Sequence, residues 1–260
     1  MPTPRKTALI TGASFGIGLE LTRIFAREGY NLVLVARSAD KLRQLASELE
    51  KAHGTRSLIL AVDLTDPGAP AYVLDQTTRA DIQIDVLVNN AGFGQYGPFA
   101  KNDLEECLRQ IQLNITTLTH LTRLYLPTMI ERKSGRILNV ASTAAFQAGP
   151  LMAVYYASKA YVLHLSEAIA NELNGTGVTV TCLCPGPTAT EFQERANIKG
   201  IRLTKYGTMD ARTVAEDGYR ALMAGKPVAI SGFKNWLVAQ SVRFAPRRMV
   251  TAIARKLQEE

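Results

Sequence analysis

The sequence of 260 residues predicts an α/β fold, in which a doubly wound parallel sheet of about seven strands carries helices on both faces. Short apolar runs alternate with stretches of helical periodicity along the chain, and the connections between them are short. A glycine-rich turn also joins the first apolar run directly to the first helical stretch. Because such alternation forms right-handed crossovers, we expect a parallel sheet with its ligand site at the carboxyl ends of the strands.

The first strand, turn and helix follow one another without spare residues. Residues 8–10 are typical of a strand buried on both faces, and apolar side chains recur at helical spacing from Ile17 until Gly29 ends the helix. Three glycines let the backbone between them turn tightly and approach a ligand: Gly12, Gly16 and Gly18. The start of the helix offers free N–H groups and the positive end of its dipole, which favours a bound pyrophosphate.

The same alternation predicts the remaining elements. Strands are expected at 31–36, 57–62, 85–89, 136–142, 178–184 and 228–231. Helices are expected at 38–53, from 66, at 104–130 with a break, at 155–173 and at 210–224. No linker separates these elements, so residues 1–232 are expected to form one domain, extended by 233–260. Within it, residues 186–209 have weak periodicity and follow a strand, which indicates a substrate loop.

The composition narrows the function classes. With 47% hydrophobic and 20% charged residues, it is typical of a soluble globular protein, and no stretch approaches the ~20 apolar residues of a membrane span. The N-terminus lacks the apolar core of an export signal, and three cysteines indicate neither a disulfide framework nor a zinc site. We therefore expect a cytoplasmic protein without a metal. The net charge of +7 is spread without interleaved aromatic residues, which argues against a nucleic-acid partner.

Tyr155 and Lys159 lie four positions apart on a predicted helix, so their side chains share one face. A phenol titrates near pKa 10, and a neighbouring ammonium group lowers that pKa by favouring the phenolate. The pair therefore suits a tyrosine general acid. Ser142 ends the preceding strand and Asn114 lies in the helix before it, so both are expected at the same sheet edge. Their alternative roles are a helix cap and an amide bonded to backbone at a helix bend.

In this order and at these intervals, Asn114, Ser142, Tyr155 and Lys159 resemble the catalytic tetrad of the short-chain dehydrogenases/reductases. The turn Thr-Gly-Ala-Ser-Phe-Gly-Ile-Gly at 11–18 is similar to that family's cofactor loop, and the resemblance covers about residues 7–190. It implies a Rossmann-type fold and an NAD(P)(H)-dependent oxidoreductase that transfers hydride between the cofactor and a ketone or secondary alcohol. The alternative function is a non-catalytic NADP(H) sensor or scaffold on the same fold.

The resemblance also implies a role for each residue. Tyr155 would protonate the carbonyl oxygen, Ser142 would polarise it, Lys159 would hold the nicotinamide ribose, and Asn114 would hold a water molecule. The residues that match cofactor-binding segments are Gly12, Ser14, Phe15, Gly16, Ile17 and Gly18 in the loop, Asp63, Leu64, Asn90, Ala91 and Gly92 beside the adenine, and Pro185, Gly186 and Thr188 beside the nicotinamide.

The end of the second predicted strand indicates the cofactor. A carboxylate there would bind the adenosine 2′-hydroxyl of NAD(H), but the sequence has Ala36-Arg37-Ser38. Arg37 favours the 2′-phosphate of NADP(H) through charge-assisted bonds, unless it is a solvated surface side chain. Position 15 is Phe, where many NADP-dependent relatives carry a basic residue, so use of NAD(H) stays open.

Apolar side chains indicate a lipophilic carbonyl substrate. The expected pocket walls, which are alternatively core residues, are Phe93, Tyr96, Phe99, Phe192 and Tyr206. Tyr156 is interpreted as a packing residue, because it should face away from Tyr155 on the helix. The three histidines lack the spacing of metal ligands.

Association with partners is predicted at two places. Family members commonly associate through the helices that correspond to 104–130 and 155–173, so the resemblance implies a homo-oligomer, either a dimer or a tetramer. The apolar surface there would come from Leu118, Leu121, Leu124 and Leu126. Residues 233–260 mix apolar and basic side chains, which indicates either two helices broken at Pro246 that pack over the pocket or a subunit, or peripheral docking on an anionic membrane.

Overall fold

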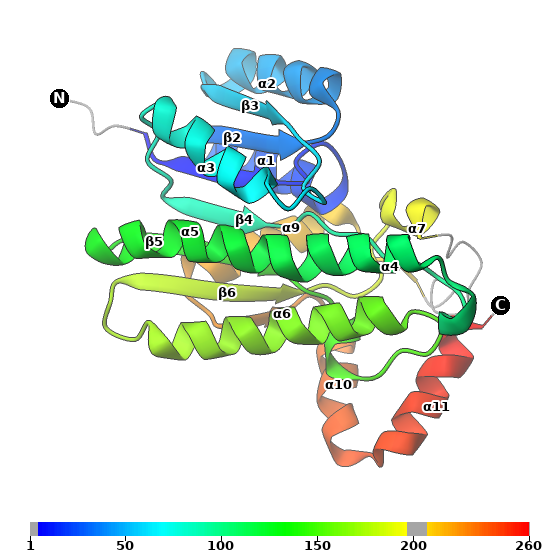
Figure 1. The fold of residues 1–260 in the computed structure, drawn as a ribbon. Coiled ribbons are helices and arrows are strands. Elements are labelled where there is room, and N and C mark those ends of the chain that lie inside the picture. The colour runs from blue at the N-terminus through cyan, green and yellow to red at the C-terminus, as the bar shows by residue number, and fades with distance from the viewer. Residues whose placement is uncertain (1–4, 197–206, 260) are drawn as a thin grey trace.

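The computed structural model describes residues 5–196 and 207–259 (Figure 1). Seven strands form one sheet in the order β3-β2-β1-β4-β5-β6-β7, and every neighbouring pair is parallel. The strands are β1 (Thr7–Thr11), β2 (Asn31–Ala36), β3 (Ser57–Ala61), β4 (Val86–Asn89), β5 (Gly135–Val140), β6 (Val178–Cys184) and β7 (Val228–Ile230). The predicted doubly wound sheet is confirmed. Its order reverses between β1 and β4, which places the ligand crevice at their carboxyl ends.

Helices cover both faces of the sheet, because alternate residues of the central strands are apolar on both sides. One face carries α1 (Gly16–Arg27), α2 (Ala39–His53) and α9 (Ala211–Met223). The other carries α3 (Ala69–Arg79), α5 (Leu118–Glu131) and α6 (Ala153–Glu172), with α4 (Leu104–Ile111) at the end of α5. On β2, Leu32 and Leu34 pack on the first face and Val33 and Val35 on the second.

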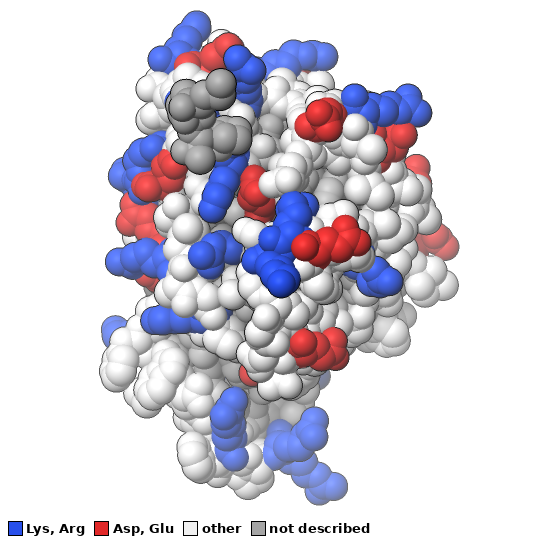
Figure 2. Space-filling model, turned by 90° about the vertical axis from the view of Figure 1, so that its left-hand side faces the viewer, with Lys and Arg blue, Asp and Glu red and all other residues white. Residues whose placement is uncertain are grey.

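The C-terminal helices stand apart from the sheet. After β7 come α10 (Phe233–Ser241) and α11 (Arg247–Gln258), which meet at an angle near Pro246 and project from the main body (Figure 1). The predicted break at Pro246 is confirmed. In Figure 2, basic and acidic side chains are interspersed over most of the visible face, whereas the lower end shows blue side chains among white ones. Among the described residues, no helix is both long and apolar enough to span a bilayer.

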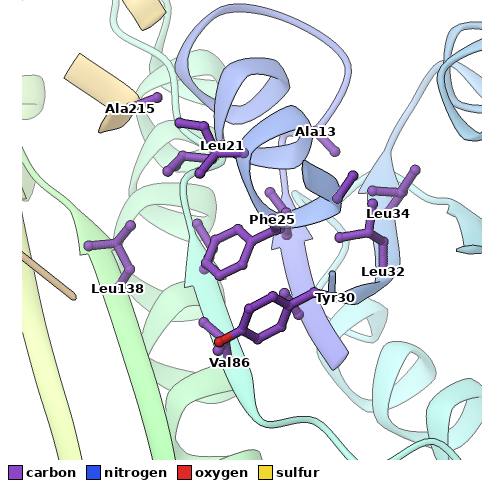
Figure 3. Close-up of a cluster of buried hydrophobic side chains, with 14 of the residues drawn as sticks. Ala13, Leu21, Phe25, Tyr30, Leu32, Leu34, Val86, Leu138 and Ala215 are labelled. Carbon is purple, nitrogen blue, oxygen red and sulfur yellow. The ribbon is translucent and has the colours of Figure 1, made fainter. Parts of the chain in front are cut away.

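The side chain of Phe25 packs between α1 and the sheet (Figure 3). Its side chain is fully buried, and its ring meets that of Tyr30 edge to face at 5.1 Å between centroids. Leu34, Leu138 and Ala215 bring β2, β5 and α9 into the same cluster. Dense packing of this kind makes α1 rigid, and it thereby holds the glycine turn at the start of that helix in place.

Two predicted boundaries differ from the structure for local reasons. The helix expected from Asp66 begins at Ala69, because the carboxylate of Asp66 accepts the N–H of Gly68 at 2.7 Å and forms a turn first. The break expected within 104–130 is a π-helical turn, Gln112–Thr117. Such turns are frequent at functional sites, and this one carries Asn114.

Of the four leucines expected at the helix pairing, of which some were expected to face the sheet, two do so and two do not. Leu118 and Leu121 are buried, whereas Leu124 and Leu126 are only partly buried. More exposed apolar side chains lie on α4: Leu104, Leu108 and Ile111.

Candidate active site

The glycine turn requires glycine for two reasons. Gly12 and Gly16 have φ of +67° and +56°, in the left-handed region that favours glycine. A Cβ on Gly12 would lie 2.8 Å from Nδ2 of Asn90, and one on Gly18 would collide with the carbonyl oxygen of Gly12. The first turn of α1 contains no acidic residue, and the N-cap residue is Phe15, whose side chain has no atom that accepts a hydrogen bond from the helix N–H groups. The N–H groups of this turn are therefore placed to bind an anion.

Thr11 and Asn90 join the ends of β1 and β4. Oγ1 of Thr11 accepts the N–H groups of Asn90 and Ala91, both at 3.0 Å, and donates to the carbonyl oxygen of Val88 at 3.2 Å. In return, Nδ2 of Asn90 donates to the carbonyl oxygen of Thr11 at 2.9 Å. Asn90 thus positions the turn through backbone groups. Sequence reasoning missed Thr11, because its role is visible only once two distant strands are neighbours.

Two cavities meet along this edge of the sheet, and they share Gly12, Phe15, Ala91, Gly92 and Phe93 in their linings. The cavity that Tyr155 lines opens to solvent and is called the catalytic cavity. The predicted residues in its lining include Gly16, Ile17, Ser142, Tyr155, Lys159, Pro185, Gly186 and Thr188. The other is called the adenine-side cavity, and Arg37, Asp63 and Leu64 line it. Ser14 and Gly18 line neither cavity, so Gly18 acts by close packing.

The strand end and the long helix bring three polar side chains to the catalytic cavity. Ser142, two residues after β5, accepts the N–H of Ala144 at 3.1 Å and donates to the carbonyl oxygen of Pro185 at 3.4 Å. Lys159 is 5% exposed, and its Nζ donates to the carbonyl oxygen of Val140 at 2.8 Å. The same Nζ lies 5.7 Å from the centre of the Tyr155 ring. The four-residue spacing on α6 therefore places Tyr155 and Lys159 together, as predicted.

Asn114 lies beside this group and uses its amide to hold a loop. Its Nδ2 donates to the carbonyl oxygen of Phe93 at 2.9 Å and to Oγ of Ser158 at 3.0 Å, and its Oδ1 accepts the N–H of Phe93 at 3.2 Å. A Cβ on Gly92 would lie 3.1 Å from Oδ1 of Asn114 and 3.4 Å from Nζ of Lys159. The bend of the π-helical turn thus gives Asn114 the backbone-bonding role, next to Lys159 across Gly92.

The walls of the catalytic cavity agree with the predicted ones in part. Phe93 and Phe192 line it, and the Phe192 ring lies 5.2 Å from that of Tyr155. Phe99 is 67% exposed and lines neither cavity, so that prediction is wrong. Tyr206 and part of the substrate loop lie outside the described residues. Tyr156 is buried against Gly149, as a packing residue should be, but it also lines the cavity.

Two residues from the C-terminal helices lie at the catalytic cavity or against its lining, without any signal in the sequence. Gln258, at the end of α11, lines it. Asn235 of α10 packs so closely on Gly186 that a Cβ there would collide with its amide. These contacts join segments far apart in sequence, so periodicity cannot reveal them.

A family model for the short chain dehydrogenases matches residues 6–199, which is most of the chain. The chain belongs to the short-chain dehydrogenase/reductase family. A ketoacyl reductase, HetN, of Nostoc sp. is 39% identical over 181 residues, 70% of this chain and 63% of the relative. A short chain dehydrogenase of Pseudocercospora fijiensis is 37% identical over 189 residues, 72% of this chain and 61% of the relative. The chain thus matches less than two thirds of the length of these curated relatives.

Solved structures of this family are similar over nearly the whole chain. A short-chain dehydrogenase of Sphingobium yanoikuyae in complex with NADPH is 34% identical, with a TM-score of 0.81, and the match covers 92% of this chain and 94% of that one. A bulky-bulky ketone specific alcohol dehydrogenase of Comamonas testosteroni is 31% identical, with a TM-score of 0.79 and 93% of both chains covered.

Burial controls the protonation of the central pair in this short-chain dehydrogenase. Burial raises the pKa of the Tyr155 phenol above its ordinary value, although a hydrogen bond with Ser142 acts to lower it. Burial also lowers the pKa of Lys159 to about 8, against the effect of the buried thiols of Cys182 and Cys184. Lys159 was expected to lower the pKa of Tyr155, but burial raises that pKa by more. Removal from water favours the neutral form of both groups. Tyr155 stays a proton donor at neutral pH.

Arg109 is a further charged residue of the adenine-side cavity, and the sequence did not single it out. Its guanidinium lies 2.6 Å from the carboxylate of Glu106 and 3.6 Å from that of Asp63. Burial raises the pKa of Asp63, but hydrogen bonds from Thr65 and the charges of Arg37 and Arg109 outweigh this and hold the pKa below its ordinary value. Asp63 is therefore a carboxylate that accepts hydrogen bonds at neutral pH.

The lowered pKa of Lys159 predicts that this lysine destabilises the folded protein. Between pH 8 and 10.5 the unfolded chain binds more protons at this site, so the wild-type stability rises with pH there. A pKa lowered from 10.5 to about 8 corresponds to about 3 kcal/mol. At pH 7, Lys159→Met should therefore have a higher free energy of unfolding than wild type, measured by urea denaturation. The gain is reduced by about 1 kcal/mol, because the variant loses the hydrogen bond to Val140. At pH 9.5 the difference in free energy of unfolding between the variant and wild type should be less than half of that at pH 7.

The control for this measurement is Lys101→Met at an exposed position, which should match wild type at both pH values. A Lys159→Met protein that is less stable than wild type at pH 7 would show that the buried ammonium group is a net stabiliser.

Proposed function

We propose that this protein is an NADP(H)-preferring oxidoreductase that reduces a lipophilic ketone and oxidises the corresponding secondary alcohol. The observation that carries the proposal is the convergence of Ser142, Tyr155 and Lys159 on one cavity that adjoins the glycine turn. A purely structural protein of this fold would have no use for a buried phenol and a buried amine at that place. We propose that it acts in the cytoplasm.

The residues of the two cavities fit a nicotinamide dinucleotide. The glycine turn provides a close backbone approach and the N–H groups of α1 for a pyrophosphate, and Gly92 leaves room beside Lys159. In this proposal Asp63 and Leu64 hold the adenine, Tyr155 and Lys159 the ribose, and the segment 185–188 the nicotinamide. Bound there, the cofactor supplies the hydride for reduction or accepts it in the reverse direction.

Tyr155 moves the proton in the proposed reaction. During reduction its O–H bond breaks and the proton passes to the carbonyl oxygen, which becomes the alcohol hydroxyl, while Tyr155 is left as a phenolate. Ser142 donates a hydrogen bond to the same oxygen, and the Lys159 ammonium group stabilises the phenolate by its charge. In alcohol oxidation the phenolate takes the proton back.

Tyr155→Phe tests the proposed reaction. Removal of the hydroxyl should lower kcat by about 10²- to 10⁴-fold, the usual range for a lost general acid. NADPH affinity should stay within about threefold, because the glycine turn and Lys159 remain. NADPH absorbance measures turnover on a panel of ketones, and NADPH fluorescence measures binding.

Tyr72→Phe, at an exposed position on α3, is the matched control and should retain the turnover. A Tyr155→Phe protein with wild-type rates would contradict the mechanism. Absence of NADPH oxidation by wild type across the panel, with release of a partner protein on NADPH addition, would instead support the sensor or scaffold function.

The preference for NADP(H) rests on the end of β2. Ala36 and Arg37 line the adenine-side cavity, Arg37 is exposed, and neither of the two residues directly after the strand, Arg37 and Ser38, is acidic. An exposed guanidinium suits a phosphate better than a hydroxyl. The solved relative of Sphingobium yanoikuyae, which is in complex with NADPH, supports the same preference.

Ala36→Asp tests this preference. The new carboxylate should repel the 2′-phosphate and accept the 2′-hydroxyl of NADH, so the NADPH/NADH ratio of kcat/KM should fall at least tenfold. The measurement is steady-state kinetics with both cofactors, and Ala36→Asn is the uncharged control. A wild-type preference for NADH of tenfold or more, about 1.4 kcal/mol, would contradict the proposal.

The substrate proposed here is a lipophilic ketone. Besides Tyr155, the catalytic cavity is lined by apolar side chains such as Met152, Phe93 and Phe192. Such walls recognise hydrocarbon by contact and leave few groups to bind a sugar. The Comamonas testosteroni relative described as specific for bulky ketones supports the same class.

We also propose a homo-oligomer, a dimer or a tetramer, formed through α4 and α6. Leu104, Leu108 and Ile111 are exposed on α4, and Tyr161 is exposed on α6. The three α4 residues recur at i, i+4 and i+7 and so share one helix face, and exposed apolar side chains grouped in this way are typical of an interface between subunits.

For α10 and α11 we propose docking on an anionic membrane surface. Seven large apolar side chains are exposed there: Phe233, Trp236, Leu237, Val238, Phe244, Met249 and Ile253. Residues 233–258 also contain six Lys or Arg and no Asp or Glu, which agrees with the blue and white lower end in Figure 2. A second copy would present like charges, whereas an anionic headgroup layer complements them, at about 1 kcal/mol for each basic residue.

Co-sedimentation with vesicles of 30% phosphatidylserine tests the docking. Wild type should sediment with these vesicles at low salt, and binding should fall with added salt or with neutral phosphatidylcholine vesicles. Phe244→Ser with Leu237→Ser should abolish binding, and the matched control is Leu104→Ser with Leu108→Ser on α4. Equal recovery in the supernatant with and without vesicles would contradict docking. Light scattering that shows self-association of wild type, lost when Leu237→Ser and Phe244→Ser are combined, would assign this surface to a second copy.

A further inference from the structure

Gln258 is the last residue of α11, and the fold returns it to the catalytic cavity. Its carbonyl oxygen accepts the hydroxyl of Tyr96 at 2.7 Å, and its Nε2 donates to the hydroxyl of Tyr156. The side chain is 1% exposed and lines the same cavity as Tyr155. A glutamine near the end of a surface helix is ordinarily solvated, so complete burial at this position calls for a reason.

Only the nitrogen of the Gln258 carboxamide has a hydrogen-bond partner among the described residues. Its Oε1 is buried, and none of the described residues donates a hydrogen bond to it. An unpaired buried acceptor costs free energy, which a leucine of similar size would avoid. The same cavity is also lined by the hydrocarbon of Met152 and Phe192, which cannot donate a hydrogen bond. A ligand in the cavity can supply the donor that the described residues do not.

We propose that Gln258 determines substrate specificity by accepting a hydrogen bond from a hydroxyl or amide N–H of the substrate. Gln258 and Tyr155 line one cavity, so a single ligand reaches both when its carbonyl lies at Tyr155 and its donor at Oε1. The substrate class is a lipophilic ketone with a second, remote hydrogen-bond donor. This inference rests on the proposed function for the place of the carbonyl, but the donor contact can be measured as binding alone.

Polar recognition in an apolar pocket discriminates strongly. A ligand that lacks the donor leaves Oε1 unpaired in the complex, whereas one that carries it satisfies the acceptor. The preference for the donor should therefore be about tenfold or more in affinity.

Three matched ketones test the proposal: 4-phenylcyclohexanone, its para-hydroxyphenyl analogue and its para-methoxyphenyl analogue. Calorimetry measures their affinities for the full-length protein with and without saturating NADP⁺, which cannot give hydride, so no turnover occurs. Wild type should bind the hydroxyl compound about tenfold more tightly than the other two. Gln258→Leu should bind all three within about twofold of one another.

Tyr156→Phe separates recognition from a structural role. It removes the bond to Nε2 but leaves the carboxamide, so the preference for the hydroxyl should persist. Equal affinities in wild type, or a preference for the methoxy compound, would overturn the proposal, and neither result depends on whether Gln258→Leu folds. Loss of the preference in Tyr156→Phe as complete as in Gln258→Leu would overturn it too, since Gln258 would then act only by positioning Tyr156.

Failure of this proposal and failure of the proposed function give different results. Ketone reduction without a preference for the hydroxyl compound would support the proposed function and contradict the role of Gln258. A preference for the hydroxyl compound in binding, without any ketone reduction, would support the role of Gln258 and contradict the proposed function.

Discussion

The close approach of the glycine turn to the end of β4 is the constraint on which the site depends. Oγ1 of Thr11 and the amide of Asn90 join two strands that are 79 residues apart in sequence. Gly12 and Gly18 make the approach possible, because a side chain at either position would meet the backbone or Asn90. Once these strand ends are joined, the loop after β4 is directed towards Asn114 and Lys159. The cofactor crevice and the catalytic group are therefore parts of one backbone arrangement.

Removal from water has opposite consequences for the two central groups. It keeps Tyr155 protonated, as the proposed ketone reduction requires, and it weakens the charge on Lys159, which the proposed mechanism uses. The carbonyl oxygen of Val140 compensates in part by accepting a hydrogen bond from the ammonium group. The site thus maintains a charge at some expense of stability, as is common where chemistry requires a buried ionisable group.

Sequence patterns predicted correctly those features that depend on residues close together in the chain, such as strands and helix faces. β6 was expected at 178–184 and lies there, because its Val and Thr side chains are β-branched and favour a strand, which is paired on both sides by β5 and β7. The pairing of Tyr155 with Lys159 followed from helical spacing alone. The patterns failed where tertiary contacts decide. Leu118 and Leu121 are apolar whether they face the sheet or a second subunit, and burial of Gln258 depends on a helix that returns across the chain.

The return of α11 has a consequence for how such proteins diversify. The stretch that matches the family model ends at residue 199, whereas Gln258 lines the catalytic cavity and Asn235 packs on its lining residue Gly186 from beyond it. Mutation in this C-terminal segment can alter the pocket wall without touching the residues proposed to hold the nucleotide or transfer the proton. Substrate range can therefore evolve separately from chemistry, and two members with matching motifs can differ in what they bind.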